Sequence, residues 1–138
     1  AKAFYHVQSA ATSLGPTFQT IAGKEDILFQ SAKLAAIGHA DLTDTTNTVI
    51  SVLAAYHGKI TSASDATAQL NAIIGNGNVT MQEFASAMRG GLLPIAAQSG
   101  VSLASLGAAF GTLTDEGFGA SQAATYLRSA MIQLQLPA

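Results

Sequence analysis

Residues 102–117 read SLASLGAAFGTLTDEG, and this segment contains the features that predict the fold of the whole chain. Ser102 is a favoured helix N-cap, because its hydroxyl can accept a hydrogen bond from a free amide of the first turn. The apolar side chains that follow recur at helical spacing, and they are Leu103, Leu106, Phe110 and Leu113. Gly117 follows Asp115-Glu116 and is a residue type that ends helices. A short, capped helix with one apolar face is therefore predicted.

Amphipathic segments of the same kind fill the rest of the chain. Their stripes contain Phe4, Val7, Ala11 and Leu14; Ile27, Ser31, Leu34 and Ala35; Leu42, Val49, Leu53 and Tyr56; Ala66, Leu70, Ile73 and Ile74; Phe84, Met88 and Leu92; and Ala123, Ala124, Leu127, Met131 and Leu134. Asp41 and Ser62 are predicted N-caps, and Thr80 with Glu83 forms a capping box. Each stripe ends at a helix breaker, and these are Gly15-Pro16, Gly38, Gly58, the 75–78 loop, Gly100 and Gly117.

No segment shows the alternating, β-branched pattern of a strand over five or more residues. The predicted fold is all-α: a compact bundle of about seven short helices arranged as antiparallel helical hairpins. Residues 1–138 are expected to form a single domain. We also expect the domain to be a fragment of a longer protein, because it begins at Ala1 without a methionine and stops abruptly at Pro137-Ala138.

The composition excludes several classes of function. Only 10% of the residues are charged, against about 25% in an ordinary soluble domain, and the formal net charge is −2. Nucleic-acid binding needs a surplus of lysine and arginine, which this chain lacks. Cysteine is absent, so disulfides and thiolate metal sites are excluded.

The stretch 90–114 contains no charged residue and is about long enough to span a bilayer. Pro94 and several glycines and serines interrupt it, whereas a spanning helix is richer in large apolar residues. We therefore expect this stretch to pack within the folded domain. Later insertion into a membrane, or the lining of a pore, remains an alternative that composition does not exclude.

The residues that could carry chemistry are few and scattered. His6, His39 and His57 lie far apart in the sequence, and no pair has the spacing of a helical zinc site. Asp115 and Glu116 are neighbours whose side chains point about 100° apart on a helix, which predicts a solvated helix end. The glycines at 75–78 and at 90–91 lack the lysine of a phosphate-binding loop. The sequence therefore predicts no catalytic, cofactor-binding or metal-binding residues, and no enzyme.

Residues 63–70 (ASDATAQL) resemble residues 120–127 (ASQAATYL) at four of eight positions. Each octet follows a segment that ends in glycine, so the match could mark a duplicated hairpin. Chance similarity between two Ala/Ser-rich segments is the alternative interpretation.

Three segments carry a resemblance to a known family. They are HADLTDTTNTVISVLAAYHGKITSASDAT at 39–67, MQEFASAM at 81–88, and SGVSLASLGAAFGTLTDEGFGASQAATYLRSAM at 99–131, with Leu93-Pro94-Ile95-Ala96-Ala97 between the last two. In order and spacing this series resembles the core region of phage tail tape measure proteins. The resemblance covers residues 25–135 and, more weakly, the helix before them.

The resemblance implies a structural role in which the protein sets tail length and templates polymerisation of the tail tube. It implies tail assembly chaperones, the tail tube protein and tail tip proteins as partners, with self-association and contact with the host membrane during ejection as further expectations. It implies location in the lumen of the tail tube of the virion, and in the host cytoplasm during assembly. The alternative class is a secreted or membrane-active helical interaction module without enzymatic activity.

Overall fold

The computed structural model describes residues 2–14, 18, 20–76 and 79–135. These residues form eight helices: α1 (Lys2–Leu14), α3 (Ile21–Ile37), α4 (Leu42–Ala55), α5 (Ala63–Asn76), α6 (Met81–Met88), α7 (Leu92–Gln98), α8 (Leu103–Asp115) and α9 (Ala120–Gln135). The described part of the chain contains no strand. The all-α prediction is confirmed, with one helix more than the approximate number expected.

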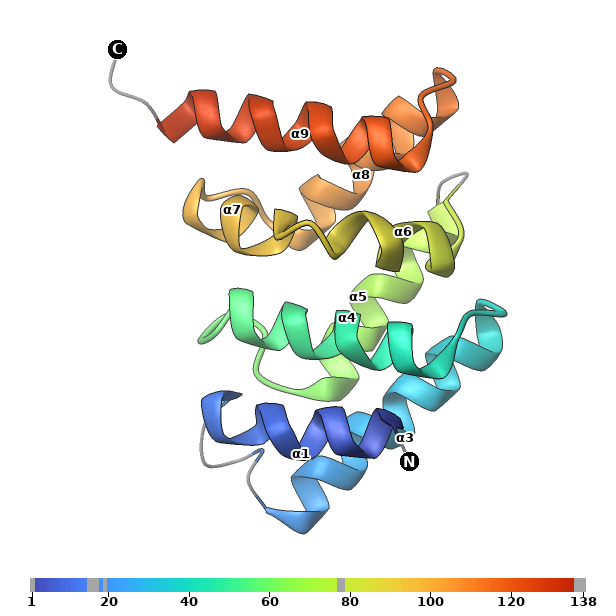
Figure 1. Cartoon of the computed structure of the whole chain (residues 1–138), viewed down its shortest axis with the longest axis vertical. Helices are drawn as coiled ribbons and strands as arrows, with labels where there is room; N and C mark the ends of the chain where they lie inside the picture. The colour runs from blue at the N-terminus through green and yellow to red at the C-terminus, as the bar shows by residue number, and fades with distance from the viewer. Residues whose placement is uncertain (1, 15–17, 19, 77–78, 136–138) are drawn as a thin grey trace.

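The helices form two layers, one behind the other in Figure 1, and within each layer they are stacked along the long axis of the molecule. The first layer contains α1, α4, the pair α6 and α7, and α9, each packed against the next. The second layer contains α3, α5 and α8, which cross behind the first layer and also pack in sequence. The chain therefore alternates between layers as it climbs the stack.

The predicted helix caps are confirmed. Asp41 Oδ2 accepts a hydrogen bond from the Asp44 amide at 2.9 Å, and Ser62 Oγ accepts one from the Asp65 amide at 3.0 Å. Ser102 Oγ accepts one from the Ser105 amide at 3.1 Å. The capping box of Thr80 and Glu83 is complete, with both of its hydrogen bonds at 3.0 Å. The α3 helix has a further N-cap, Thr20, that the sequence analysis missed.

These caps recur with a constant period. In the first layer Asp41 precedes α4, Thr80 precedes α6 and Gly119 precedes α9, and these three positions are equally spaced along the chain. We call the interval from Asp41 to Thr80, and from Thr80 to Gly119, the repeat step. The Gly119 amide donates to Gln122 Oε1 at 3.1 Å, just as the Thr80 amide donates to Glu83.

The second layer has nearly the same period, since the interval from Ser62 to Ser102 is longer than the repeat step by a single position. The chain is thus a stack of units of about 40 residues, each with one first-layer and one second-layer segment.

Burial follows the same period. Val49, Met88 and Leu127 share one position of the first-layer unit, and all three are buried. Leu14, Leu53, Leu92 and Met131 share another position and are also buried. The octets at 63–70 and 120–127 do not share a position, because the first lies in second-layer α5 and the second in first-layer α9. Their similarity does not mark the structural repeat, whose period is shorter.

Two predicted boundaries need correction. Gly75 and Asn76 are the last residues of α5 rather than loop residues, while 77–78 lie outside the described residues. Leu92 starts α7 instead of continuing the helix of Phe84, because Gly91 turns the chain with a φ of 80°. Pro94 fits the first turn of α7, where a missing amide costs no intrahelical hydrogen bond. The predicted stop at Gly15-Pro16 and the side chain of Ala11 lie outside what the structure describes.

The core is continuous from α1 to α9, and Phe84 and Phe110 are among its largest fully buried side chains. Their rings meet edge to face, with centroids 5.8 Å apart. Three predicted stripe residues are exposed instead: Phe4, Leu42 and Leu134. Phe4 and Leu134 lie on the two outermost first-layer helices, which have a neighbouring first-layer helix on only one side (Figure 1). Leu42 is the first residue of its helix.

Two glycines permit close approach between units. A Cβ atom on Gly107 of α8 would lie 2.4 Å from Ile73 Cγ1 of α5, much closer than atoms can pack. A Cβ atom on Gly38 would lie 2.7 Å from Met81 Cβ. Ile73 therefore lies directly on the backbone of α8, and the α5–α8 contact depends on the missing side chain.

We predict that Gly107→Ala destabilises the fold by about 1–3 kcal/mol, because the added methyl group overpacks the contact with Ile73. The matched control is Gly111→Ala in the same helix, where the nearest atom to a new Cβ is Val79 Cγ2 at 3.8 Å. Alanine has the higher helix propensity by about 1 kcal/mol, so the control should be neutral or stabilising. Urea denaturation measures both, and equal effects of the two substitutions would contradict the packing account.

Candidate interaction surface

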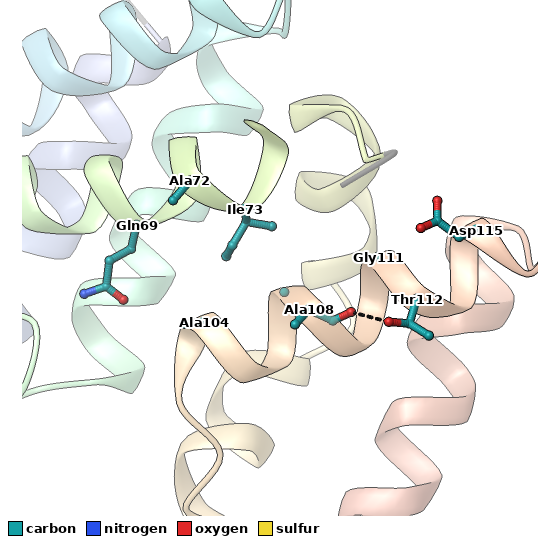
Figure 2. Close-up of a pocket in the computed structure, with 9 residues that line it drawn as sticks. Gln69, Ala72, Ile73, Ala104, Ala108, Gly111, Thr112 and Asp115 are labelled. Carbon is teal, nitrogen blue, oxygen red and sulfur yellow. Dashed lines mark hydrogen bonds between the residues drawn. The ribbon is translucent and has the colours of Figure 1, made fainter. Parts of the chain in front are cut away.

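Two grooves cross the second layer between successive units. The groove between α5 and α8 has a volume of about 440 Å³ and is shown in Figure 2. Its α5 side contains Gln69, Ala72 and Ile73, and its α8 side contains Ala104, Gly107, Ala108, Gly111, Thr112 and Asp115. A smaller groove of about 230 Å³ lies between α3 and α5.

The two grooves are equivalent in the repeat. The residues of α3 at the smaller groove include Gln30, Lys33 and Leu34, which lie one repeat step before Gln69, Ala72 and Ile73. The residues of α5 at the smaller groove are Ser64, Thr67, Ala68 and Asn71, which precede Ala104, Gly107, Ala108 and Gly111 by the interval that separates Ser62 from Ser102.

A side-chain hydrogen bond also recurs between the two units. Each glutamine amide donates to the aspartate one helical turn before it, Gln30 to Asp26 at 3.5 Å and Gln69 to Asp65 at 3.3 Å. The two second-layer grooves are therefore copies of one feature of the repeat.

The lining of the α5–α8 groove suits contact rather than chemistry. Its small side chains leave the helix backbones close to the surface, and Ile73 forms an apolar wall. Thr112 donates its hydroxyl to the Ala108 carbonyl at 2.9 Å, as Figure 2 shows, so this hydroxyl serves the helix itself. Asp115 stands at the end of the groove and is exposed. The lining includes no pairing of a nucleophile with a base.

A third groove, of about 690 Å³, lies in the first layer between α4 and the break that separates α6 from α7. It is lined mainly by small and apolar residues, with Arg89 and Gln98 among its polar ones. The Arg89 guanidinium pairs with the Asp44 carboxylate at 2.8 Å. Because the arginine side chain is mostly exposed, this ion pair contributes little to stability by itself.

Polar bridges fix the first-layer helices on either side of that groove. The Gln82 side chain accepts from the Asp41 amide at 3.0 Å and donates to Asp44 at 2.8 Å, which ties α6 to the start of α4. The last helix is held in a similar way, because Arg128 of α9 donates to the Gly90 carbonyl at 2.9 Å. Arg128 lies one repeat step after Arg89, so both arginines reach back towards the preceding first-layer segment.

A further bond ties the other end of α9. The Gln135 side chain donates to Ser99 Oγ at 2.8 Å, which links the end of α9 to the end of α7. The α9 helix is thus held to the preceding first-layer segment at its middle and at its C-terminal end.

The structure does not bring the candidate histidines together. His39 is exposed in the left-handed conformation that ends α3, with a φ of 51°. His57 is exposed after α4, on the wall of a groove formed by the α4–α5 and α7–α8 connections. His6 lies in α1, and its side chain is outside the described part. Asp115 and Glu116 are both exposed at the end of α8. Among the described side chains, no three histidine, aspartate or glutamate residues are placed to hold a metal ion.

The uncharged stretch 90–114 forms most of α7 and α8, and Leu103, Leu106 and Phe110 on it are buried in the core. Within the described ranges, none of the helices has both the length and the apolar character needed to cross a bilayer.

Tyr56, which the sequence predicts only as a core residue, also makes a hydrogen bond between units. Its hydroxyl donates to the Val101 carbonyl at 2.8 Å, which links the end of α4 to the α7–α8 connection. Burial raises the pKa of the Tyr56 phenol to about 12, because the phenolate would be poorly solvated there.

Comparison with known proteins decides the family. The family described as phage-related minor tail protein matches the chain over residues 5–138, which is nearly its whole length. The chain belongs to this family. No curated protein and no solved structure matches it. The role of this minor tail protein is therefore structural, as a component of a phage tail, and the expectation of a phage tail protein is confirmed at that level.

We predict that the protonated Tyr56 phenol contributes to the free energy of unfolding and that this contribution is lost at high pH. The folded-state pKa lies above the ordinary value of 10, so the phenol's contribution is complete below pH 10 and is lost as the pH rises towards 12. Tyr56→Phe should cost about 1 kcal/mol at neutral pH by removing the hydrogen bond to Val101. Urea denaturation from pH 8 to 12 should show the wild type falling towards the variant, whereas parallel pH profiles would contradict the assignment.

Proposed function

We propose that this chain is part of a tail tape measure protein. The observation that carries the proposal is the phage-related minor tail protein match over residues 5–138, together with the ordered motif series of the tape measure core within it. In this role the parent protein sets tail length, templates polymerisation of the tail tube and leaves the tail ahead of the genome. None of these steps requires a catalytic group in this segment.

The proposed surroundings follow from that role. During assembly in the host cytoplasm the protein would contact tail assembly chaperones, and in the virion it would occupy the tube lumen beside the tail tube and tail tip proteins. The grooves between units, with their small side chains and few charges, are surfaces on which such protein partners could pack. Self-association and contact with the host membrane during ejection belong to the same proposal.

We further propose that the segment is a compact domain rather than part of the extended ruler. A ruler acts through its length, and a continuous helix advances about 1.5 Å per residue. The longest described helix, α3, has 17 residues. The chain crosses to the other layer after each first-layer or second-layer segment. A folded stack of this kind adds little length per residue. We assign it to initiation, to chaperone or tip contacts, or to ejection.

An in-frame deletion of residues 41–134 from the parent gene tests this assignment. The compact-domain proposal predicts tails that are missing, aberrant, or of normal length but non-infectious, as seen by electron microscopy and plaque assay. A shaft segment would instead give infectious particles with tails shorter by about 1.5 Å for each deleted residue. Clean proportional shortening with retained infectivity would overturn the compact-domain proposal.

A control of unchanged chain length separates folding from length. Phe110→Lys places an unpaired charge in the core and should cost several kcal/mol, so it unfolds the domain without shortening the chain. If the folded domain acts in assembly or ejection, this variant should reproduce the phenotype of the deletion. An equally stable Phe110→Lys protein, or strong liposome binding by the native domain, would instead favour the membrane-active alternative.

A further inference from the structure

The last helix, α9, and the turn before it expose four large apolar side chains. Phe118, just before the helix, is 39% exposed, Tyr126 is 58% exposed, Ile132 is 40% exposed and Leu134 is 72% exposed. The rings of Phe118 and Tyr126 also contact each other, with centroids 6.2 Å apart. The only charged residue in α9, Arg128, is engaged with the Gly90 carbonyl. Phe118 and Tyr126 therefore form an uncharged apolar pair, which we call the α9 patch.

The same two positions are buried in the preceding unit. Phe118 lies one repeat step after Val79, which is 5% exposed, and Tyr126 lies one step after Ala87, which is 6% exposed. The α9 patch thus consists of positions that are buried in the preceding unit and exposed in the last one.

The covering elements in the earlier units identify what is missing. Val79 Cγ2 lies against Gly111 of α8, at 3.8 Å from where a Cβ would be. The second-layer helix of the same unit therefore supplies the cover. The equivalent cover for Phe118 would be one more second-layer helix, the one that follows α9.

We propose that in the full-length protein the α9 patch is covered by a further second-layer helix, supplied by the segment that follows α9 in the same polypeptide. In each complete unit the second-layer N-cap follows the first-layer N-cap at a nearly constant interval, from Asp41 to Ser62 and from Thr80 to Ser102. The same interval counted from Gly119 places the new N-cap at position 140 or 141. Like the tape measure role, this inference requires a longer parent chain, but it does not depend on what the parent does.

The pattern of the existing second-layer helices defines the expected helix. Buried apolar residues occupy its first, fourth and eighth positions, as in Ala63, Ala66 and Leu70 of α5 and in Leu103, Leu106 and Phe110 of α8. The fifth position is small, with Thr67 in α5 and Gly107 in α8. An amphipathic helix with a serine or threonine cap and this spacing would continue the α3–α5–α8 layer.

The first test uses only the sequence in hand. Position 138 corresponds to Ser99 in the repeat, so a second copy of residues 100–118 fused after Ala138 places a copy of α8 in register behind α9. The matched control carries Leu103→Gln, Leu106→Gln and Phe110→Gln in the fused copy alone. The chain has no cysteine, so Phe118→Cys or Tyr126→Cys gives a single thiol whose labelling rate reports cover of the patch. Ser129→Cys, at an exposed position elsewhere on α9, is the reference thiol.

We expect the fused copy to slow labelling at 118 and 126 by about tenfold or more, because labelling then requires local opening, and to leave the rate at 129 unchanged. The control fusion should give the rates of the unextended chain. Equal labelling in both fusions, with the fold intact by circular dichroism, would overturn the proposal that the patch accepts a second-layer helix.

The second test uses the intact parent protein. The proposal predicts that the thiols at 118 and 126 are protected in the full-length chain and that the parent's own segment near position 140 is responsible, so truncation after residue 138 should restore labelling. Reactive thiols in the full-length protein would overturn it. Sedimentation that shows the 138-residue chain to be a dimer, abolished by Tyr126→Glu, with reactive thiols in the parent, would assign the patch to a second copy. Tail phenotypes are scored separately, so the inference and the proposed function can fail independently.

Discussion

The contact between Gly107 and Ile73 is the constraint on which the upper half of the stack depends. Here α5 packs on α8. In the second layer of the described chain, this pair of helices joins the half formed by α1–α5 to the half formed by α6–α9. At the equivalent position of α5 the chain carries Thr67, whose hydroxyl donates to the Ala63 carbonyl at 3.0 Å. This position of the repeat therefore holds a side chain in α5, where Leu34 lies on the facing helix. In α8 it must be glycine, because Ile73 lies on the facing helix instead.

Other contacts between helices accompany the contact of Gly107 with Ile73. The Phe84 and Phe110 rings meet edge to face across the layers, Gln82 links α6 to the start of α4, and Tyr56 links the end of α4 to the α7–α8 connection. Two unpaired buried hydroxyls lie nearer the N-terminal end of the stack. Ser31 of α3 and Thr45 of α4 have buried hydroxyl oxygens without a hydrogen-bond partner among the described atoms, and each such group costs about 1–3 kcal/mol. Stability should therefore be highest in the middle of the stack.

Local features of this fold were predictable from the sequence, because they depend on residues close together in the chain. The caps at Asp41, Ser62, Thr80 and Ser102 follow from side-chain chemistry within a single helical turn. The repeat was not predictable, because its period is expressed in caps and burial rather than in residue identity. One fully buried position of the first-layer unit holds Thr45, Phe84 and Ala123 in turn. The similar octets at 63–70 and 120–127 share composition but lie in different layers. The grooves were likewise not predictable, since they depend on which helices meet.

We therefore expect this minor tail protein of small, mostly uncharged residues to unfold as one cooperative stack across the α5–α8 junction. Native-state hydrogen exchange of the 138-residue chain tests that claim most directly, because it resolves opening free energies along a repeat structure. The account predicts that amides of α4, α5, α6 and α8 share one highest opening free energy, with α1, α3 and α9 opening at lower cost. Exchange of α1–α5 and of α6–α9 as two groups with separate opening free energies would contradict it.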